Sequence, residues 1–200
     1  MRIHILSDLH NEFRELTGYG AEADVTVLAG DIDLGERGFA WACSAFAERP
    51  VIYIAGNHEY YGHAIPSLTN KLLRKKNPGT VRFLECTGVT IQGMRFLGCT
   101  LWSDFEIAGD MAGSMQASQD RMNDYRKIRV SPRYRRLQPK DTAKRNAVDS
   151  TYHQLRAGES AAYGLVAKMS SFPILMCLFL CRRILALFSE ADSTNCEYII

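Results

Sequence analysis

The first hundred residues alternate short apolar runs with segments in which apolar residues recur every three or four positions. Three of the apolar runs, at 3–6, 25–29 and 51–55, are too short for ordinary helices, and each is followed by polar residues. Such runs predict buried β-strands, whereas the spacing between them is typical of helices that cover a sheet. The order of the elements therefore indicates an α/β fold with a layered sheet core.

One helix is expected between the second and third of these strands, another after the third strand, and a last one farther along the chain. Their apolar faces carry Phe39, Cys43 and Phe46 within 35–48, and Leu68, Leu72 and Leu73 within 65–76. The third helix is expected at 141–156. Further short strands are expected at 81–84, 89–91 and 95–100, and Gln92-Gly93 between the last two predicts a hairpin turn.

The composition of the chain is that of an ordinary globular protein, with 200 residues, 46% hydrophobic residues and a formal charge of +2. It excludes collagen-like and mostly disordered classes. Six cysteines without a CxxC pair give no disulfide scaffold or zinc ribbon, and no secretory signal begins the chain, so we expect a cytoplasmic protein. The apolar run 172–181 is shorter than the roughly 20 residues that span a bilayer, so no membrane span is favoured.

Potential metal ligands follow each of the first three predicted strands. The motifs are Asp8-Leu9-His10, Gly30-Asp31-Ile32-Asp33 and Gly56-Asn57-His58-Glu59. Open α/β sheets build their sites at the carboxyl ends of strands, and residues two apart in extended backbone face the same way. Carboxylate, imidazole and amide oxygen together suit Mn, Fe or Zn.

In this order, the motifs DLH, GDID and GNHE resemble those of the calcineurin-like metallophosphoesterases. Stretches 98–105 and 122–126 are also similar to a small bacterial branch of that superfamily. The resemblance covers about residues 1–155. It implies a calcineurin-like layered α-β-β-α sandwich and a metal-dependent hydrolase of phosphate mono- or diesters.

The resemblance also implies roles for individual residues at a dinuclear site. Asp8 and His10 would hold the first of two divalent ions, Asp31 would bridge both, and Asn57 would bind the second. His58 would act on the leaving-group oxygen as a general acid or steady the charge of the transition state. Two further residues have open interpretations: Asp33 orients a histidine or belongs to a turn, and His63 contacts substrate or lies at the surface.

The family pattern continues with C-terminal histidine motifs that this sequence lacks, because its last histidine is His153. We therefore expect an N-terminal metallophosphoesterase part at 1–155 and an atypical apolar tail at 156–200, replaced or frameshifted, which leaves the sandwich incomplete. Such a chain would hold one ion or none tightly. The alternative function is a catalytically inactive remnant or a binding module.

Charge is distributed unevenly along the chain. Residues 121–145 hold ten Lys and Arg against two Asp, whereas residues 1–60 hold four against ten acidic residues. The basic segment is either a solvated surface or a rim that attracts a phosphorylated substrate. A nucleic-acid partner has no motif in its support, and neither the substrate, the metal nor the oligomeric state follows from the sequence.

Overall fold

A five-stranded parallel sheet forms the centre of the computed structural model, which describes residues 1–18, 20–75, 79–157, 163–167 and 197–199. Its strand order is β11-β1-β2-β3-β5, and all four pairings are parallel. The strands are β1 (Arg2–Leu6), β2 (Val25–Ala29), β3 (Val51–Ile54), β5 (Val81–Phe83) and β11 (Glu197–Ile199). Every residue of β2 and β3 is buried, as expected for strands covered on both faces.

Two smaller sheets accompany it. The first has the order β10-β7-β6 and contains β6 (Thr87–Ile91), β7 (Met94–Cys99) and β10 (Tyr163–Ala167). The predicted turn joins β6 to β7, with φ of 49° at Gln92 and 81° at Gly93, as a tight hairpin requires. The second, β4-β8-β9, consists of the two-residue strands β4 (Ala64–Ile65), β8 (Arg129–Val130) and β9 (Arg135–Arg136).

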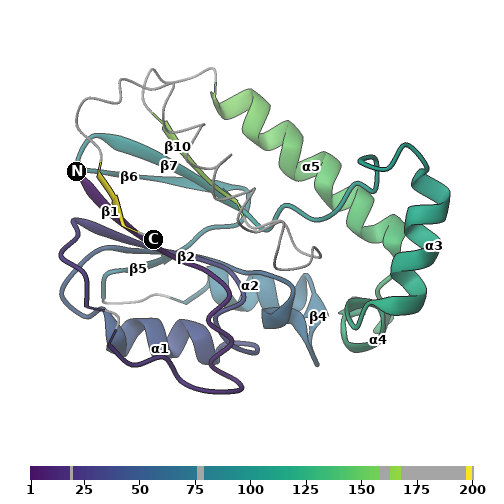
Figure 1. Cartoon of the computed structure of the whole chain (residues 1–200), viewed down its shortest axis with the longest axis horizontal. Helices are drawn as coiled ribbons and strands as arrows, with labels where there is room; N and C mark the ends of the chain where they lie inside the picture. Colours follow the sequence, from purple (N-terminus) through teal and green to yellow (C-terminus); the bar gives the residue numbers. More distant parts are fainter. Residues whose placement is uncertain (19, 76–78, 158–162, 168–196, 200) are drawn as a thin grey trace.

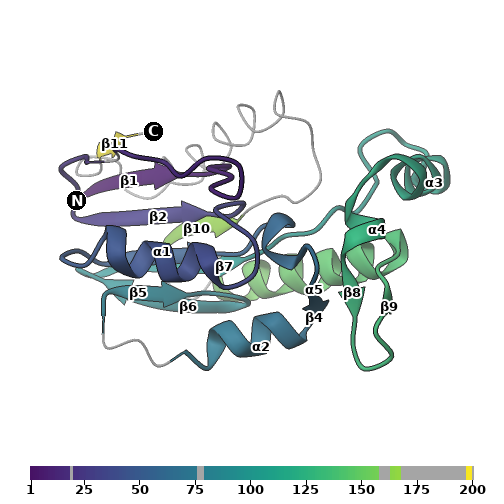
Figure 2. The same cartoon turned by 90° about the horizontal axis from the view of Figure 1, so that it is seen from below.

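Helices cover the outer faces of the two larger sheets. Figure 1 shows α1 and α2 below the five-stranded sheet and α5 above the β6–β7 hairpin, so the layers run α, β, β, α. Figure 2 shows α3 and α4 gathered with β8 and β9 at one end. The helices are α1 (Arg37–Ala45), α2 (Ser67–Leu73), α3 (Met111–Arg121), α4 (Asp124–Lys127) and α5 (Pro139–Ala157), with a 3-10 turn at His58–Tyr60.

The apolar core has two parts that match the layers. One part packs α1 and α2 on the five-stranded sheet through Phe39, Leu68 and Leu72. The other lies between the two larger sheets and includes Ile52 and Phe96, both fully buried. Removal of this apolar surface from water is the main force that holds the layers together.

Most predicted elements are confirmed, and the α/β layered fold is confirmed with them. The helix expected at 65–76 is shorter than predicted. Ile65 belongs to β4 and pairs with Val130 of β8, and the helix begins only after Pro66. Helix α3 was not predicted, since it has no buried residue and so no apolar stripe in its sequence. Most of the atypical tail, including 172–181, lies outside the described residues. Within the described residues, no helix has the length and apolar character to cross a membrane.

Candidate metal centre

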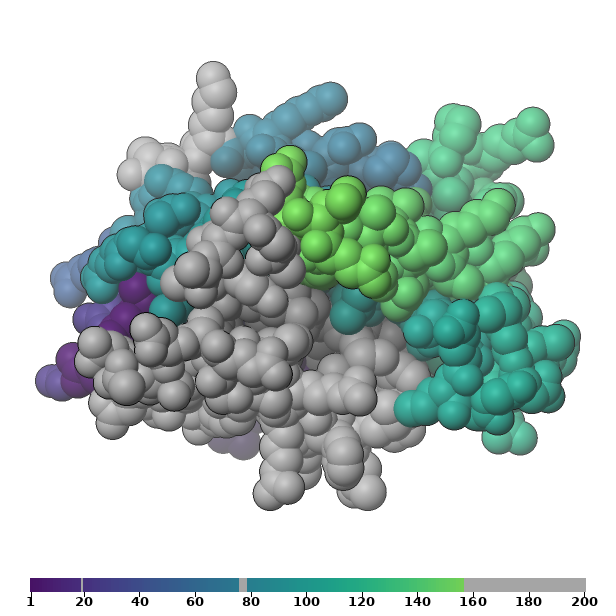
Figure 3. Space-filling view, turned by 90° about the horizontal axis from the view of Figure 1, so that it is seen from above, coloured from purple at the N-terminus to yellow at the C-terminus, as the bar shows by residue number. Residues whose placement is uncertain are grey.

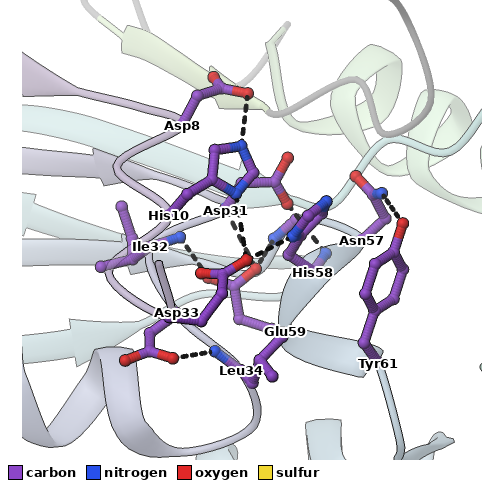
Figure 4. Close-up of polar contacts among 12 residues, drawn as sticks. Asp8, His10, Asp31, Ile32, Asp33, Leu34, Asn57, His58, Glu59 and Tyr61 are labelled. Atoms are coloured by element: carbon purple, nitrogen blue, oxygen red, sulfur yellow. Dashed lines mark hydrogen bonds and ion pairs between the residues drawn. The ribbon is translucent and has the colours of Figure 1, made fainter. Parts of the chain in front are cut away.

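The loops that leave β1 and β2 bring three predicted ligands together. One potential ligand atom each from Asp8, His10 and Asp31 lies within 4.8 Å of the others. His10 Nε2 lies 4.0 Å from Asp8 Oδ1, and Figure 4 shows both side chains beside Asp31. We call these three residues, with Asn57 and His58 from the loop after β3, the strand-end site.

The backbone at the strand-end site is held in an unusual conformation. Asp8, His10 and Asp31 have φ of 57°, 49° and 56°, in the left-handed region that residues with a Cβ rarely occupy. Backbone hydrogen bonds fix the two loops to each other, from Asp8 N to the oxygen of Gly30 at 3.1 Å and from His10 N to the oxygen of Asp31 at 3.0 Å. Strain of this kind is characteristic of functional sites.

The loop after β3 carries Asn57 and His58, and it contacts the Asp31 carboxylate through the backbone of His58. The backbone N–H of His58 donates to Asp31 Oδ1 at 2.9 Å. Asn57 is buried, and its Nδ2 donates to Asp124 Oδ1 at 3.0 Å, which fixes the orientation of the amide. Tyr61 also donates to Asp124, at 2.8 Å. Burial and the Asp124 charge raise the pKa of Tyr61, so its hydroxyl keeps its proton.

Glu59, the last residue of the third motif, joins the loops after β2 and β3. It is fully buried, and it accepts hydrogen bonds from the backbone of Asp31 at 3.1 Å, Ile32 at 2.9 Å and Gly56 at 2.7 Å, and from Tyr53 Oη at 2.9 Å. Burial and the nearby Asp31 charge raise the pKa of Glu59. In the sequence, Glu59 stood out only as the last residue of a motif. In the structure, its hydrogen bonds to the backbone hold the loop that carries Asp31.

Glu12 is a further member of the site that sequence reasoning missed. Its Oε1 lies 2.7 Å from His58 Nδ1 and 3.3 Å from His10 Nδ1. Its side chain is 6% exposed. Burial opposes its ionisation, but hydrogen bonds from His58, its own backbone and His10, together with the charge of His58, lower its pKa. A signal existed in the sequence, because Glu12 lies only two residues after His10.

The two residues with open interpretations lie apart from the metal ligands. Asp33 Oδ1 accepts from the backbone N–H of Leu34 at 2.6 Å and from Arg37 Nε at 2.9 Å, as a residue of the turn that leads into α1 (Figure 4). His63 is exposed, and a Cβ built on Gly35 would lie 2.5 Å from its Nε2. The contacts of Asp33 favour its interpretation as a turn residue. The ring of His63 lies at the surface against Gly35, which favours the surface interpretation for this residue.

A hollow of about 410 Å³ opens beside His58. Besides Glu12 and His58, the residues that line it are Phe13, Leu34, Tyr61, Gly62 and Lys127. The ammonium of Lys127 lies 4.7 Å from the centre of the Tyr61 ring, and the Phe13 side chain is largely exposed. A cation and two aromatic rings thus stand next to the histidine.

The strand-end site fits divalent metal ions. Two carboxylates and an imidazole within 4.8 Å match the ligands that Mn, Fe and Zn accept, and Asn57 offers an amide oxygen because its nitrogen is held by Asp124. The other basic residues of 121–145 lie mainly at the surface, and one of them, Arg135, forms an ion pair with Asp141 at 2.7 Å. Lys127 is the member of this segment that reaches the hollow.

Comparison with known proteins agrees with these features. No curated protein matches the chain. Among solved structures, the phosphopantetheinyl hydrolase from Mycobacterium tuberculosis is similar at 17% identity, with a TM-score of 0.54, over 98% of this chain and 75% of that one. At this identity the likeness shows the fold alone. A family model described as calcineurin-like phosphoesterase matches residues 1–142. The chain therefore belongs to the calcineurin-like phosphoesterase family, whose members are metal-dependent phosphoester hydrolases.

Proposed function

We propose that the chain hydrolyses phosphate mono- or diesters with two divalent cations held at the strand-end site. The observation that carries this proposal is the convergence of Asp8, His10 and Asp31 on strained backbone at the carboxyl ends of β1 and β2. Asp8 and His10 would hold one ion, Asp31 would bridge, and Asn57 would bind the second. Ions bound there supply a more acidic water and offset the charge of the phosphate.

The protein's own groups would orient the substrate and handle the leaving group. A water oxygen bonds to phosphorus as the bond to the ester oxygen breaks, and the departing oxygen needs a proton or a positive charge beside it. His58 stands in the wall of the hollow to provide this, with Glu12 at 2.7 Å to hold its ring. Lys127 would attract the phosphate, and Phe13 and Tyr61 would pack against an apolar leaving group.

The test is metal content together with turnover of bis-p-nitrophenyl phosphate by the purified full chain in added Mn²⁺. The decisive variant is Asp31→Asn, which keeps the size of the side chain and removes the bridging charge. Its matched control is Asp110→Asn, because Asp110 accepts from Gly113 N at the start of α3 and asparagine serves equally well there. We expect two ions and turnover that Asp31→Asn abolishes and Asp110→Asn leaves unchanged. Turnover that survives Asp31→Asn would contradict the proposal.

A binding module without turnover is the second candidate. The two ligands proposed for the second ion, Asp31 and Asn57, are too few to hold a transition metal firmly. At most one ion and no turnover in the unmodified chain would favour this function. Binding of a polynucleotide would then be measured against salt, because binding through many phosphates weakens steeply as salt rises.

A further inference from the structure

A second cluster of potential ligands lies where the end of β5 meets the middle of α5. One potential ligand atom each from Glu85, Cys86 and Asp149 lies within 4.8 Å of the others. The Cys86 thiol donates to Asp149 Oδ1 at 3.3 Å, across 63 positions of sequence. We call these three residues the thiol cluster. None of them belongs to the strand-end site, and the proposed hydrolysis uses none of them.

One oxygen of the thiol cluster is buried without a partner. Asp149 is 3% exposed, and within the described part of the chain its Oδ2 has no hydrogen-bond partner. Glu85 differs, since its Oε2 already accepts from Thr100 N at 3.1 Å and from Thr100 Oγ1 at 2.7 Å. A buried oxygen without a donor is unfavourable, because the hydrogen bonds it made to water in the unfolded chain are not replaced. A cation that binds this oxygen would remove that cost.

The surroundings disfavour three negative charges in one place. Burial, and then the neighbouring Asp149, raise the pKa of Glu85 to about 7 and that of Cys86 to about 12. Burial also raises the pKa of Asp149, although Cys86, the backbone of Leu101 and Trp102, and the charge of Arg145 act in the opposite direction. A bound divalent cation would offset the repulsion among the three groups.

The thiol cluster can be reached from solvent. A cavity of about 400 Å³ is lined by all three residues together with Lys144, Arg145 and Val148 of α5. This volume is large enough for an ion and its remaining waters. In Figure 3, part of α5 lies at the molecular surface, as the bright green segment.

We propose that Glu85, Cys86 and Asp149 form a divalent-cation site, separate from the strand-end site, for a thiophilic ion such as Zn²⁺. A thiolate with two carboxylates favours Zn²⁺ over Mg²⁺ or Ca²⁺, which prefer oxygen alone. Three protein ligands leave the fourth tetrahedral position to water. The Cys86 proton passes to solvent as the ion binds. The ion would tie the end of β5 to α5.

Cobalt is the probe, because Co²⁺ bound to a thiolate gives a charge-transfer band in the near ultraviolet and Co²⁺ bound to oxygen and imidazole does not. The purified full chain and Asp31→Asn, in which the strand-end site is impaired, should both show the band on titration with Co²⁺. Cys86→Ser should abolish it. The matched control is Cys43→Ser. It removes a thiol of α1, which is not part of the thiol cluster, and should leave the band unchanged.

A second variant separates the thiol cluster from the other cysteines of the chain. Asp149→Asn removes no thiol, yet it should weaken Co²⁺ binding at least about tenfold. Far-ultraviolet circular dichroism would confirm that both variants are folded. Should Cys86→Ser fail to fold, Asp149→Asn and protection of Cys86 by Zn²⁺ against a thiol reagent decide the matter. A band that is absent from the unmodified chain, that survives Cys86→Ser, or whose affinity is unaltered by Asp149→Asn would overturn the proposal.

Discussion

The strand-end site and the thiol cluster both form beyond the carboxyl ends of strands in the same parallel sheet, but the chain builds them differently. At the strand-end site, consecutive strands β1, β2 and β3 each deliver their residues through a short loop, and backbone hydrogen bonds fix these loops to one another. The thiol cluster needs α5 to bring Asp149 to the end of β5. One site depends on the path of the backbone, and the other on how a helix docks.

This difference has a consequence for how each site responds to change. Asp31 is held by two neighbours on the loop after β3, since Glu59 accepts from its N–H and its own Oδ1 accepts from His58 N. The ligands of the strand-end site should therefore keep their positions before any ion binds. Asp149 has a buried oxygen without a partner in the described residues, so the thiol cluster depends more on an ion to complete it.

The largest expected effect is that of His58→Asn on turnover. If His58 assists the leaving group, its loss should lower kcat about 10²-fold or more, since a positioned acid or base contributes about 10²–10⁴-fold. Metal content should remain that of the unmodified chain, because the ligands are other residues. Parallel assays of kcat and of bound metal check this. A variant that loses its metal along with its turnover would place His58 among the ligands instead.

Gly56→Ala should disturb the strand-end site through packing alone. A Cβ on Gly56 would overlap Asp31 Oδ1 and would lie 2.7 Å from the Asp31 nitrogen, so the backbone must shift. Overpacking of this kind costs about 1–3 kcal/mol, measured as a lower urea midpoint at unchanged m-value. Gly20→Ala is the control, because its Cβ would meet nothing within 4 Å. Equal stability of the two variants would show that the loops after β2 and β3 are not held as tightly as described.

The sequence predicted the strands well because their physics is local. Each of β1, β2 and β3 is a short apolar run, and the polar residues that follow it are consecutive in the chain. Parallel pairing places the carboxyl ends of β1 and β2 at one edge, and so brings the loops that carry Asp8, His10 and Asp31 together. The extended backbone expected for Asp8 and His10 is wrong, because both have left-handed backbone. Only the family resemblance supplied their separate roles.

The parts that the sequence missed are those that tertiary packing decides. Helix α3 has no buried residue, so it carries no periodic apolar signal. The hydrogen bond of Asp124 to Asn57 spans 67 positions, and that of Cys86 to Asp149 spans 63, so no local pattern could reveal either pair. Ile65 was assigned to a helix because its apolar spacing fits one, whereas its backbone pairs with β8.

Glu12→Gln tests whether the strand-end site depends on a residue outside the motifs. Glutamine keeps the shape of Glu12 but not its charge, so it would hold the rings of His58 and His10 less firmly. We expect kcat to fall about tenfold at nearly unchanged KM, the lower end of the range for groups that orient functional residues. Glu15→Gln is the control at an exposed carboxylate. A change in KM alone would indicate that Glu12 contacts substrate rather than positioning His58.

The last effect concerns the α5 side of the molecule and appears as a dependence of stability on pH. Burial lowers the pKa of His153 to about 4 from 6.5; its neighbours include the Cys99 thiol of β7, 2.8 Å from Nε2, and Tyr152 on α5 itself. Between these two pH values His153 binds more protons in the unfolded chain than in the folded one, so its own contribution to the free energy of unfolding falls as pH falls from 6.5 towards 4. Glu85, whose pKa is raised to about 7, contributes in the opposite direction. The slope that His153 contributes is at most about 1.4 kcal/mol per pH unit. In urea unfolding across this window, the unmodified chain should lose stability relative to His153→Gln as pH falls. His4 on β1, whose pKa burial and Arg49 also lower, contributes to both proteins alike and so does not affect this difference. An unaltered slope would mean that His153 is solvated, and that α5 docks less closely on β7 than the thiol cluster requires.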